Sequence, residues 1–156
     1  MNKEIVKYPN PILRKKSEEV KEVTEDIKKL GQEMIAIITE NQGLGFAAPQ
    51  IGELKRIIVV QTEKGPEVFI NPEIIKKSKK TEIGEEGCLS FPKLFLKIKR
   101  AKEAEIEALD LQGEKIKIKT EDLPARVFQH EIDHLDGILF IDRLSFWQRL
   151  KFKLKI

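Results

Sequence analysis

The segment Gln129–His134 constrains this chain most, because it holds both histidines of the sequence. His130 and His134 are four residues apart, so in a helix their imidazoles lie one turn apart on one face and can bind one metal ion. Glu131 points about 100° round the helix, beside the metal position, where a general base belongs. The order H-E-x-x-H therefore predicts a metallohydrolase helix whose third ligand lies elsewhere.

No histidine remains to supply that third ligand. The metzincin pattern H-E-x-x-H-x-x-G-x-x-H is followed as far as Gly137, but Phe140 stands where the last histidine is required. Other peptidases use a downstream glutamate, and none occurs between residues 132 and 156. Two downstream aspartates remain, but the best candidate lies upstream and is Cys88, the only cysteine. A thiolate with two imidazoles suits Zn²⁺ or Fe²⁺ and leaves a fourth position for water.

Plain alternatives stay open for these residues. A lone cysteine is most often a small buried apolar residue, and H-E-x-x-H arises by chance in many helices. Metal binding is favoured because histidine occurs nowhere else and because Cys88 lies in a Gly-Cys-Leu-Ser segment rather than an apolar run.

A third segment, Gly43–Gly52, is rich in small residues. Its glycines and alanines let another backbone approach closely, and Gln50 offers a neutral amide. Taken alone, the segment could equally be a tight packing turn after a helix. It lacks the Gly-Lys-Ser/Thr ending and the glycine spacing of a phosphate-binding loop.

Together, G-L-G-F-A-A-P-Q (43–50), E-G-C-L-S (86–90) and Q-H-E-I-D-H (129–134) resemble, in order and spacing, the three motifs of the peptide deformylase family. The resemblance includes Tyr8–Arg14 and reaches about Ser145. It implies a cytoplasmic hydrolase that removes the N-formyl group from the N-terminal formylmethionine of newly made polypeptides and releases formate, with a metal-bound hydroxide as nucleophile.

The resemblance also implies a role for each matching residue. Glu131 is the general acid and base, while the Gln50 amide and the backbone N–H of Leu89 stabilise the charge on the carbonyl oxygen. Leu44 and Gly45 hold the substrate chain as an added strand. Val127, three residues before His130, lines an apolar pocket for methionine. The metal ligands are Cys88, His130 and His134.

The expected cofactor is one divalent ion per chain, with Fe²⁺ favoured and Zn²⁺, Ni²⁺ or Co²⁺ as alternatives. The expected partners are N-formylmethionyl nascent polypeptides. The short basic tail 145–156 suggests, by resemblance, a helix that docks on ribosomal RNA phosphates. An equally good reading is a packing helix whose lysine face is solvated.

Length and composition predict one domain over residues 1–156 in a reducing compartment, and the resemblance implies that this domain is catalytic. A chain of 156 residues is too short for two ordinary domains, and one cysteine excludes an intramolecular disulfide. No apolar stretch approaches membrane-spanning length, so no membrane is expected as a partner. The net charge of +3 is small and does not predict a positive electrostatic potential over the whole surface that would attract nucleic acids.

Hydrophobic periodicity predicts an α+β fold of mostly antiparallel sheets packed around a C-terminal metal-binding helix. Thr24 caps a first helix, and Asn71-Pro72 ends a strand. The metal helix begins near Pro124 and stops at Gly137, which is a natural position just past a helix end. The remaining predicted elements are the helix Glu25–Glu40, the strands Arg56–Gln61 and Val68–Ile70, and a hairpin of Ala104–Ala108 with Lys115–Lys119.

Two further residues, Asp133 and Arg100, match a buried polar pair or network of the family. Asp133 and Arg100 are expected to pair, and Glu86 is an equally good partner for Arg100. The alternative is an ordinary surface ion pair of negligible energy. Arg126 and the segment Phe91–Phe95 depart from the commonest family pattern.

Two other function classes stay open. One is an H-E-x-x-H metallopeptidase, weakened by the missing downstream ligand. The other is a non-enzymatic RNA-binding module with a structural metal, which would need four protein ligands where only three are found.

Overall fold

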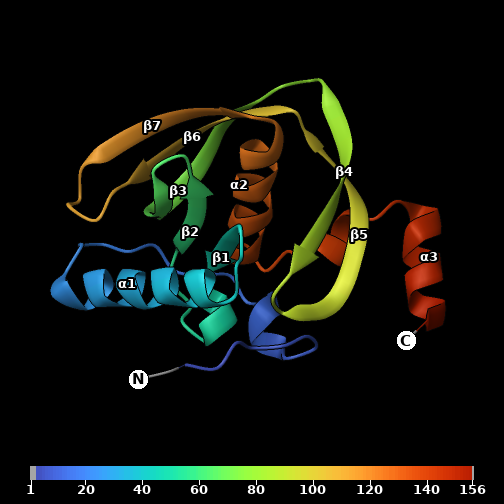
Figure 1. Ribbon diagram of the computed structural model, residues 1–156, viewed down its shortest axis with the longest axis horizontal. Coiled ribbons are helices and arrows are strands. Elements are labelled where there is room, and N and C mark those ends of the chain that lie inside the picture. Colours follow the sequence, from blue (N-terminus) through green and yellow to red (C-terminus); the bar gives the residue numbers. More distant parts are fainter. Residues whose placement is uncertain (1–2, 156) are drawn as a thin grey trace.

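The computed structural model describes residues 3–155 and combines three helices with seven strands (Figure 1). The helices are α1 (Glu25–Glu40), α2 (Asp122–Leu135) and α3 (Phe146–Lys155), with short 3₁₀ turns at Pro11–Arg14, Ala48–Ile51 and Phe140–Arg143. The strands are β1 (Gly45–Ala47), β2 (Ile57–Thr62), β3 (Gly65–Lys77), β4 (Thr81–Cys88), β5 (Phe91–Ala101), β6 (Glu103–Leu109) and β7 (Lys115–Glu121).

All paired strands are antiparallel, as expected from the sequence. Five form one sheet in the order β1-β2-β3-β6-β7, and β4 with β5 forms a separate two-stranded sheet. One expectation needs correction: the helix that carries the H-E-x-x-H residues is α2, and α3 follows it. The expected C-terminal helix is thus the penultimate helix of the described chain.

The first helix forms as its sequence predicts. Thr24 Oγ1 accepts a hydrogen bond from the backbone N–H of Ile27, and two acidic residues in the first turn favour the helix N-terminus. The apolar residues at helical spacing are buried, and they pack on one face of the large sheet.

Strand β2 lies between two hydrophobic cores. Ile57 and Val59 face the core under α1, whereas Ile58 and Val60 face the core under α2. Because successive side chains of a strand point to opposite faces, a strand covered on both sides needs a continuous apolar run, and Ile57–Val60 supplies one. This arrangement places α2 between the large sheet and the β4–β5 sheet.

Strand β3 continues through Asn71-Pro72, where the sequence predicts an end. Its pairing with β6 shifts register between Ile70 and Glu73. Asn71 has a positive φ of 51°, and its side chain accepts from the N–H of Val20 and donates to the Val20 carbonyl. The side chain thus takes over backbone pairing with a distant segment, so the strand bulges instead of stopping.

The boundaries of α2 differ slightly from the expected ones. The helix starts at Asp122, so Pro124 falls in the first turn, where its missing N–H costs no helical hydrogen bond. Gly137 lies just past the end with φ of +72°, and the N–H of Ile138 bonds to the Asp133 carbonyl. This closure of the helix end confirms the predicted role of Gly137.

We expect Gly137→Ala to destabilise the fold strongly. An added Cβ would lie 2.4 Å from the carbonyl oxygen of Arg14, and the positive φ strains any L-residue. The combined strain and overpacking should cost roughly 2–5 kcal/mol, measured by urea unfolding. Gly113→Ala is the matched control, because its φ is +80° but its nearest contact would lie at 3.7 Å. Equal losses in the two variants would contradict this account.

Among residues 3–155, no helix combines the length and the apolar character needed to cross a lipid bilayer.

Candidate metal centre

The three sequence-predicted ligands converge in the fold. Cys88 ends β4, and His130 and His134 lie one turn apart on α2. One ligating atom from each of the three residues lies within 4.8 Å of the others. Cys88 Sγ is 3.4 Å from Nε2 of His134. Residues 42 positions or more apart in sequence are therefore brought into one cluster by the packing of β4 against α2.

The cluster fits a divalent transition metal. Its donor set is one sulfur and two imidazole nitrogens, which suits zinc or ferrous iron and leaves a coordination position open. His130 uses Nδ1 to bond Glu86 at 2.9 Å, which leaves its Nε2 for a metal. Glu131 Oε1 and His134 Nδ1 are buried and have no hydrogen-bond partner among residues 3–155. Unpaired polar atoms of this kind are expected where a ligand or ordered water completes a site.

In the metal-free protein the two histidines differ in charge. Burial opposes a charge on His130, but Glu131, Cys88 and Glu86 raise its pKa to about 10. Burial, together with the positive His130 and Arg100, lowers the pKa of His134 well below its usual range. A metal ion that binds both rings must therefore displace a proton from His130.

Glu131 is buried beside the cluster and is not part of it. Burial raises the pKa of Glu131 to about 7 in the metal-free protein, with Glu86 adding to the effect and His130 opposing it. A divalent cation nearby would favour the ionised form. Gly45 makes room for the carboxylate, since a Cβ there would lie 2.6 Å from Glu131 Oε2. The sequence predicts that another backbone approaches this loop, but at Gly45 the close neighbours are the side chains of Glu131 and Val127.

Gln50 lies on the other side of the thiol. Its Oε1 accepts from the backbone N–H of Ala47 at 2.9 Å, which turns the amide nitrogen toward the site. That nitrogen, Nε2, donates to Ser90 Oγ at 3.1 Å and approaches Cys88 Sγ at 3.6 Å. The side chain is fully buried and held at both ends.

An open pocket of about 610 Å³ lies in front of the cluster. Its walls include every residue that the sequence assigns to substrate or to catalysis: Leu44, Gly45, Gln50, Leu89, Val127 and Glu131. On one side lies β1, an edge strand of the large sheet, and on the other side lies β4, which pairs only with β5 among the described strands. An extended peptide could therefore pair with a free strand edge there.

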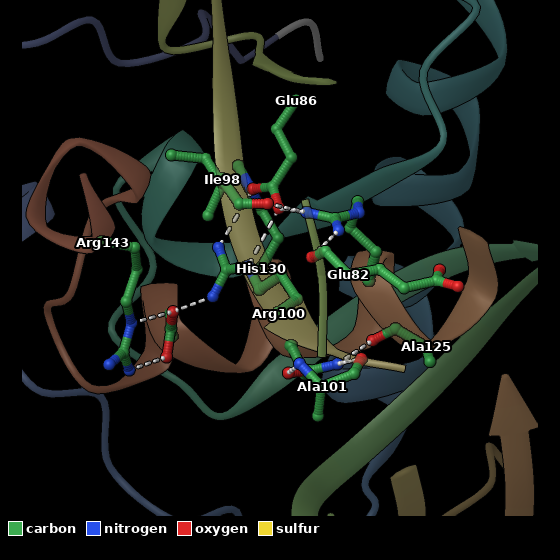
Figure 2. A network of polar contacts seen from close by, with 11 residues as sticks. Glu82, Glu86, Ile98, Arg100, Ala101, Ala125, His130 and Arg143 are labelled. Carbon is green, nitrogen blue, oxygen red and sulfur yellow. Dashed lines mark hydrogen bonds and ion pairs between the residues drawn. The ribbon is translucent and has the colours of Figure 1, made fainter. Parts of the chain in front are cut away.

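A buried network of charges surrounds Glu86, as Figure 2 shows. Arg100 donates to both oxygens of Glu86, at 2.9 and 3.0 Å, and to Asp133 at 2.6 Å. From the sequence, either Glu86 or Asp133 could be the partner of Arg100. In the structure, Arg100 pairs with both. The alternative of a surface ion pair is wrong, because Glu86 and Arg100 are only 4% exposed at their side chains. Burial opposes ionisation of Glu86, but hydrogen bonds from His130 and Arg100 lower its pKa to about 2.

The contacts of three nearby residues, Arg143, Gln129 and Arg126, were not predicted from the sequence. Arg143 binds Asp133 through two nitrogens, at 2.8 and 3.0 Å. Gln129 bonds the backbone N–H and carbonyl of Ala101 and so ties α2 to the end of β5. Arg126 was noticed only as an unusual residue. The available signal was its spacing, four residues before His130 on the same helix face.

The C-terminal helix α3 is attached along one side. Phe152 packs against the small core around Leu13 and Phe140, and Gln148 donates to the carbonyl of Lys97. Phe146 and Trp147 are 72% and 71% exposed. Both readings of the tail therefore keep support, because one face packs and another is left open to solvent.

Comparison with known proteins agrees with the class of hydrolase that the site suggests. The family model for polypeptide deformylase matches residues 2–150. A peptide deformylase of Dictyoglomus thermophilum is 47% identical over 143 residues, with 92% of this chain and 93% of the relative covered. One of Thermotoga neapolitana is 43% identical over 143 residues, with 92% and 87% covered.

Solved structures agree as well. The crystal structure of peptide deformylase from Thermotoga maritima superposes with a TM-score of 0.90 at 41% identity, covering 93% of this chain and 99% of that one. A peptide deformylase from Plasmodium falciparum gives 0.90 at 39% identity, with 97% and 92% covered. These matches define a metal-dependent hydrolase of α+β fold. The chain belongs to the polypeptide deformylase family, whose members remove N-formyl groups from nascent proteins.

Proposed function

We propose that this chain hydrolyses the formamide of N-formylmethionyl polypeptides and releases formate. One observation carries the proposal: three soft and borderline donors, Cys88, His130 and His134, meet beside the buried carboxylate of Glu131, in a pocket that can receive a peptide end. Helix α2 would then be the metal-binding helix between the large sheet and the β4–β5 sheet.

The proposed cofactor is one divalent ion per chain, held by Cys88 Sγ and one nitrogen of each histidine, with Fe²⁺ as the native metal. Such an ion would supply a Lewis acid that acidifies water and polarises the formyl carbonyl. The donor set is compatible with this ion, because a thiolate with two imidazoles suits ferrous iron as well as zinc.

The protein's own groups would manage the protons and the charge. Glu131 would take the proton from the attacking water and deliver it to the departing amine, because its buried carboxylate lies beside the metal cluster and lines the pocket. The Gln50 amide N–H and the backbone N–H of Leu89 would donate to the carbonyl oxygen as negative charge grows there. Because the Gln50 amide is already held by Ala47, little reorganisation would be needed.

Substrate recognition would use both walls of the pocket. The polypeptide would pair as an added strand between Leu44–Gly45 and the backbone before Cys88. The methionine side chain would enter beside Val127, which lies one turn before His130 on the pocket face of α2.

A metallopeptidase is the alternative for an H-E-x-x-H site. It is tested by incubating the metal-loaded protein with a formyl-Met peptide and with the same peptide carrying a free N-terminus. The proposal expects formate and an intact deformylated peptide from the first, and no product from the second. Internal cleavage of either peptide would favour the peptidase.

If Fe²⁺ is the native metal, the activity of the enzyme should be sensitive to air. Ferrous iron and the Cys88 thiolate can both be oxidised, and the half-exposed Cys88 lines the open pocket. We expect the Fe²⁺ enzyme to lose activity in air while the Ni²⁺ or Co²⁺ enzyme keeps it. The measurement follows formate release during aerobic incubation of protein prepared anaerobically with each metal. Equal lifetimes for all three metals would count against an iron enzyme.

We also propose that α3 contributes to contact with the ribosome. The support is the solvent-exposed pair Phe146 and Trp147 beside the cations Arg149 and Lys151. Salt-sensitive co-sedimentation with ribosomes, lost on replacing Arg149 and Lys151 by glutamine, would support it. Retention of that binding in the double variant would argue against it.

A further inference from the structure

Arg126 is a buried cation that none of the proposed catalytic steps uses. It lies on α2, one turn before His130, and is only 8% exposed. Its Nη1 donates to Glu86 Oε2 and to the carbonyl oxygen of Ile98, both at 2.7 Å. Its Nη2 donates to the carbonyl oxygen of Glu82 at 2.8 Å. Figure 2 labels these three acceptors, which come from both strands of the small sheet.

The small sheet leaves space for this guanidinium. Gly84 faces it from β4, and a Cβ at that position would lie 2.9 Å from Arg126 Nε and 3.0 Å from Cζ. The absence of a side chain at Gly84 therefore lets the cation lie against the strand. Two strand carbonyls and one carboxylate then fix its orientation.

Glu86 connects Arg126 to the metal cluster. Its Oε1 bonds Nδ1 of His130 at 2.9 Å, and its two oxygens also accept from Arg100 at 3.0 and 2.9 Å. The carboxylate is thus held from two sides, by Arg100 on β5 and by Arg126 on α2. A carboxylate on one ring nitrogen fixes the tautomer and the rotation of a histidine, so that the other nitrogen can bind metal.

We propose that Arg126 is a positioning residue for the metal centre, which holds Glu86 against His130 and so keeps the free ring nitrogen directed at the metal. The inference rests on the proposed role of His130 as a ligand. Arg126 acts through Glu86, because no hydrogen bond joins it to Cys88, His130 or His134 among the described contacts. Arg126 also lines the substrate pocket, so this contribution must be separated from its support of Glu86 by the choice of variant.

The Arg126→Met variant separates the support of Glu86 from the lining of the pocket, because methionine keeps an unbranched apolar stem and removes the guanidinium. We expect the dissociation constants for Zn²⁺ and Co²⁺ to rise by roughly 10–100-fold, as is typical when a residue that supports a metal ligand is lost. The absorption spectrum of the Co²⁺ form should change, since the His130 ring can rotate. At saturating metal, kcat for a formyl-Met peptide should fall by roughly tenfold or more, while KM stays within about threefold.

Three further variants complete the test. Gly84→Ala keeps the arginine but pushes the guanidinium from its place, so it should weaken metal binding in the same direction. Arg126→Lys should recover part of the metal affinity through one donor to Glu86. Arg143→Met is the matched control: it removes a guanidinium from Asp133, at the far end of the network, and does not contact Glu86. It should leave the metal dissociation constants unchanged.

The proposal is overturned if Arg126→Met and Gly84→Ala bind metal as tightly as the unmodified protein, if the loss appears in KM alone, or if Arg143→Met weakens metal binding equally. If Arg126→Met fails to fold, the metal dissociation constants of Gly84→Ala decide. Because these constants do not depend on turnover, failure of this inference differs from failure of the proposed function, which would appear as absent formate release from the unmodified protein.

Discussion

Replacing Glu131 by glutamine is expected to reduce formate release by about 10²–10⁴-fold, the contribution of a lost general base. Glutamine has nearly the same shape but cannot accept the proton of the attacking water. Its amide still fits beside Gly45, where the carboxylate now lies. Because Glu131 is buried next to the metal cluster and is not one of its three members, the variant should keep its metal and its fold.

Metal content and turnover must therefore be measured on the same preparation. Elemental analysis should find one ion per chain in Glu131→Gln, as in the unmodified protein. Glu63→Gln, an exposed residue in the turn after β2, is the matched control and should release formate at the normal rate. Loss of the metal together with activity in Glu131→Gln would show that the carboxylate is a ligand and that its role as base is wrong.

Cys88→Ser is expected to abolish formate release by removing the metal. Serine keeps the size of cysteine but exchanges a soft thiolate for a hard hydroxyl, which binds zinc or ferrous iron far more weakly. In the unmodified protein a coordinated thiolate should react slowly with iodoacetamide, and chelation should expose one reactive thiol, since the chain has a single cysteine. Mass spectrometry of the alkylated protein, with and without chelator, measures the difference.

The metal content and turnover of Cys88→Ser also test whether Cys88 is the third ligand. Stoichiometric metal and near-normal turnover in this variant would mean that the third ligand is a carboxylate. Asp136 is the closest alternative in sequence, but it lies at the end of α2 and bonds Arg56 at 2.9 Å, so it is engaged elsewhere. We therefore propose the Cys88 thiolate, and not the Asp136 carboxylate, as the third ligand.

Sequence patterns predicted the helices and strands that are determined by interactions between residues close together in the sequence. The boundaries of α1 follow from Thr24 and from the apolar stripe, because capping and helix periodicity both act within a few residues. The hairpin of β6 and β7 follows from alternating residues on either side of Gly113. The cluster of candidate ligands could also be predicted, because two of them share one helix turn and the third is the only cysteine of the sequence.

Two features that depend on distant partners were not predicted. Asn71 reads locally as the end of a strand, and only its pairing with Val20, 51 residues away, turns it into a bulge. Arg126 appears in the sequence only as a departure from the commonest family pattern, and its role depends on β4 and β5, which bring Glu86 and two strand carbonyls to it. Long-range contacts of this kind leave no periodic trace in the sequence.

One measurement tests the central claim most directly: anaerobic titration of Fe²⁺ into metal-free protein while formate release from a formyl-Met peptide is recorded. The account predicts no turnover without metal, a linear rise with added Fe²⁺, and a sharp end at one ion per chain, with the same titration of Cys88→Ser remaining flat. Formate release from the metal-free protein, or a rise in Cys88→Ser equal to that of the unmodified protein, would contradict the assignment of Cys88, His130 and His134 as the catalytic metal site.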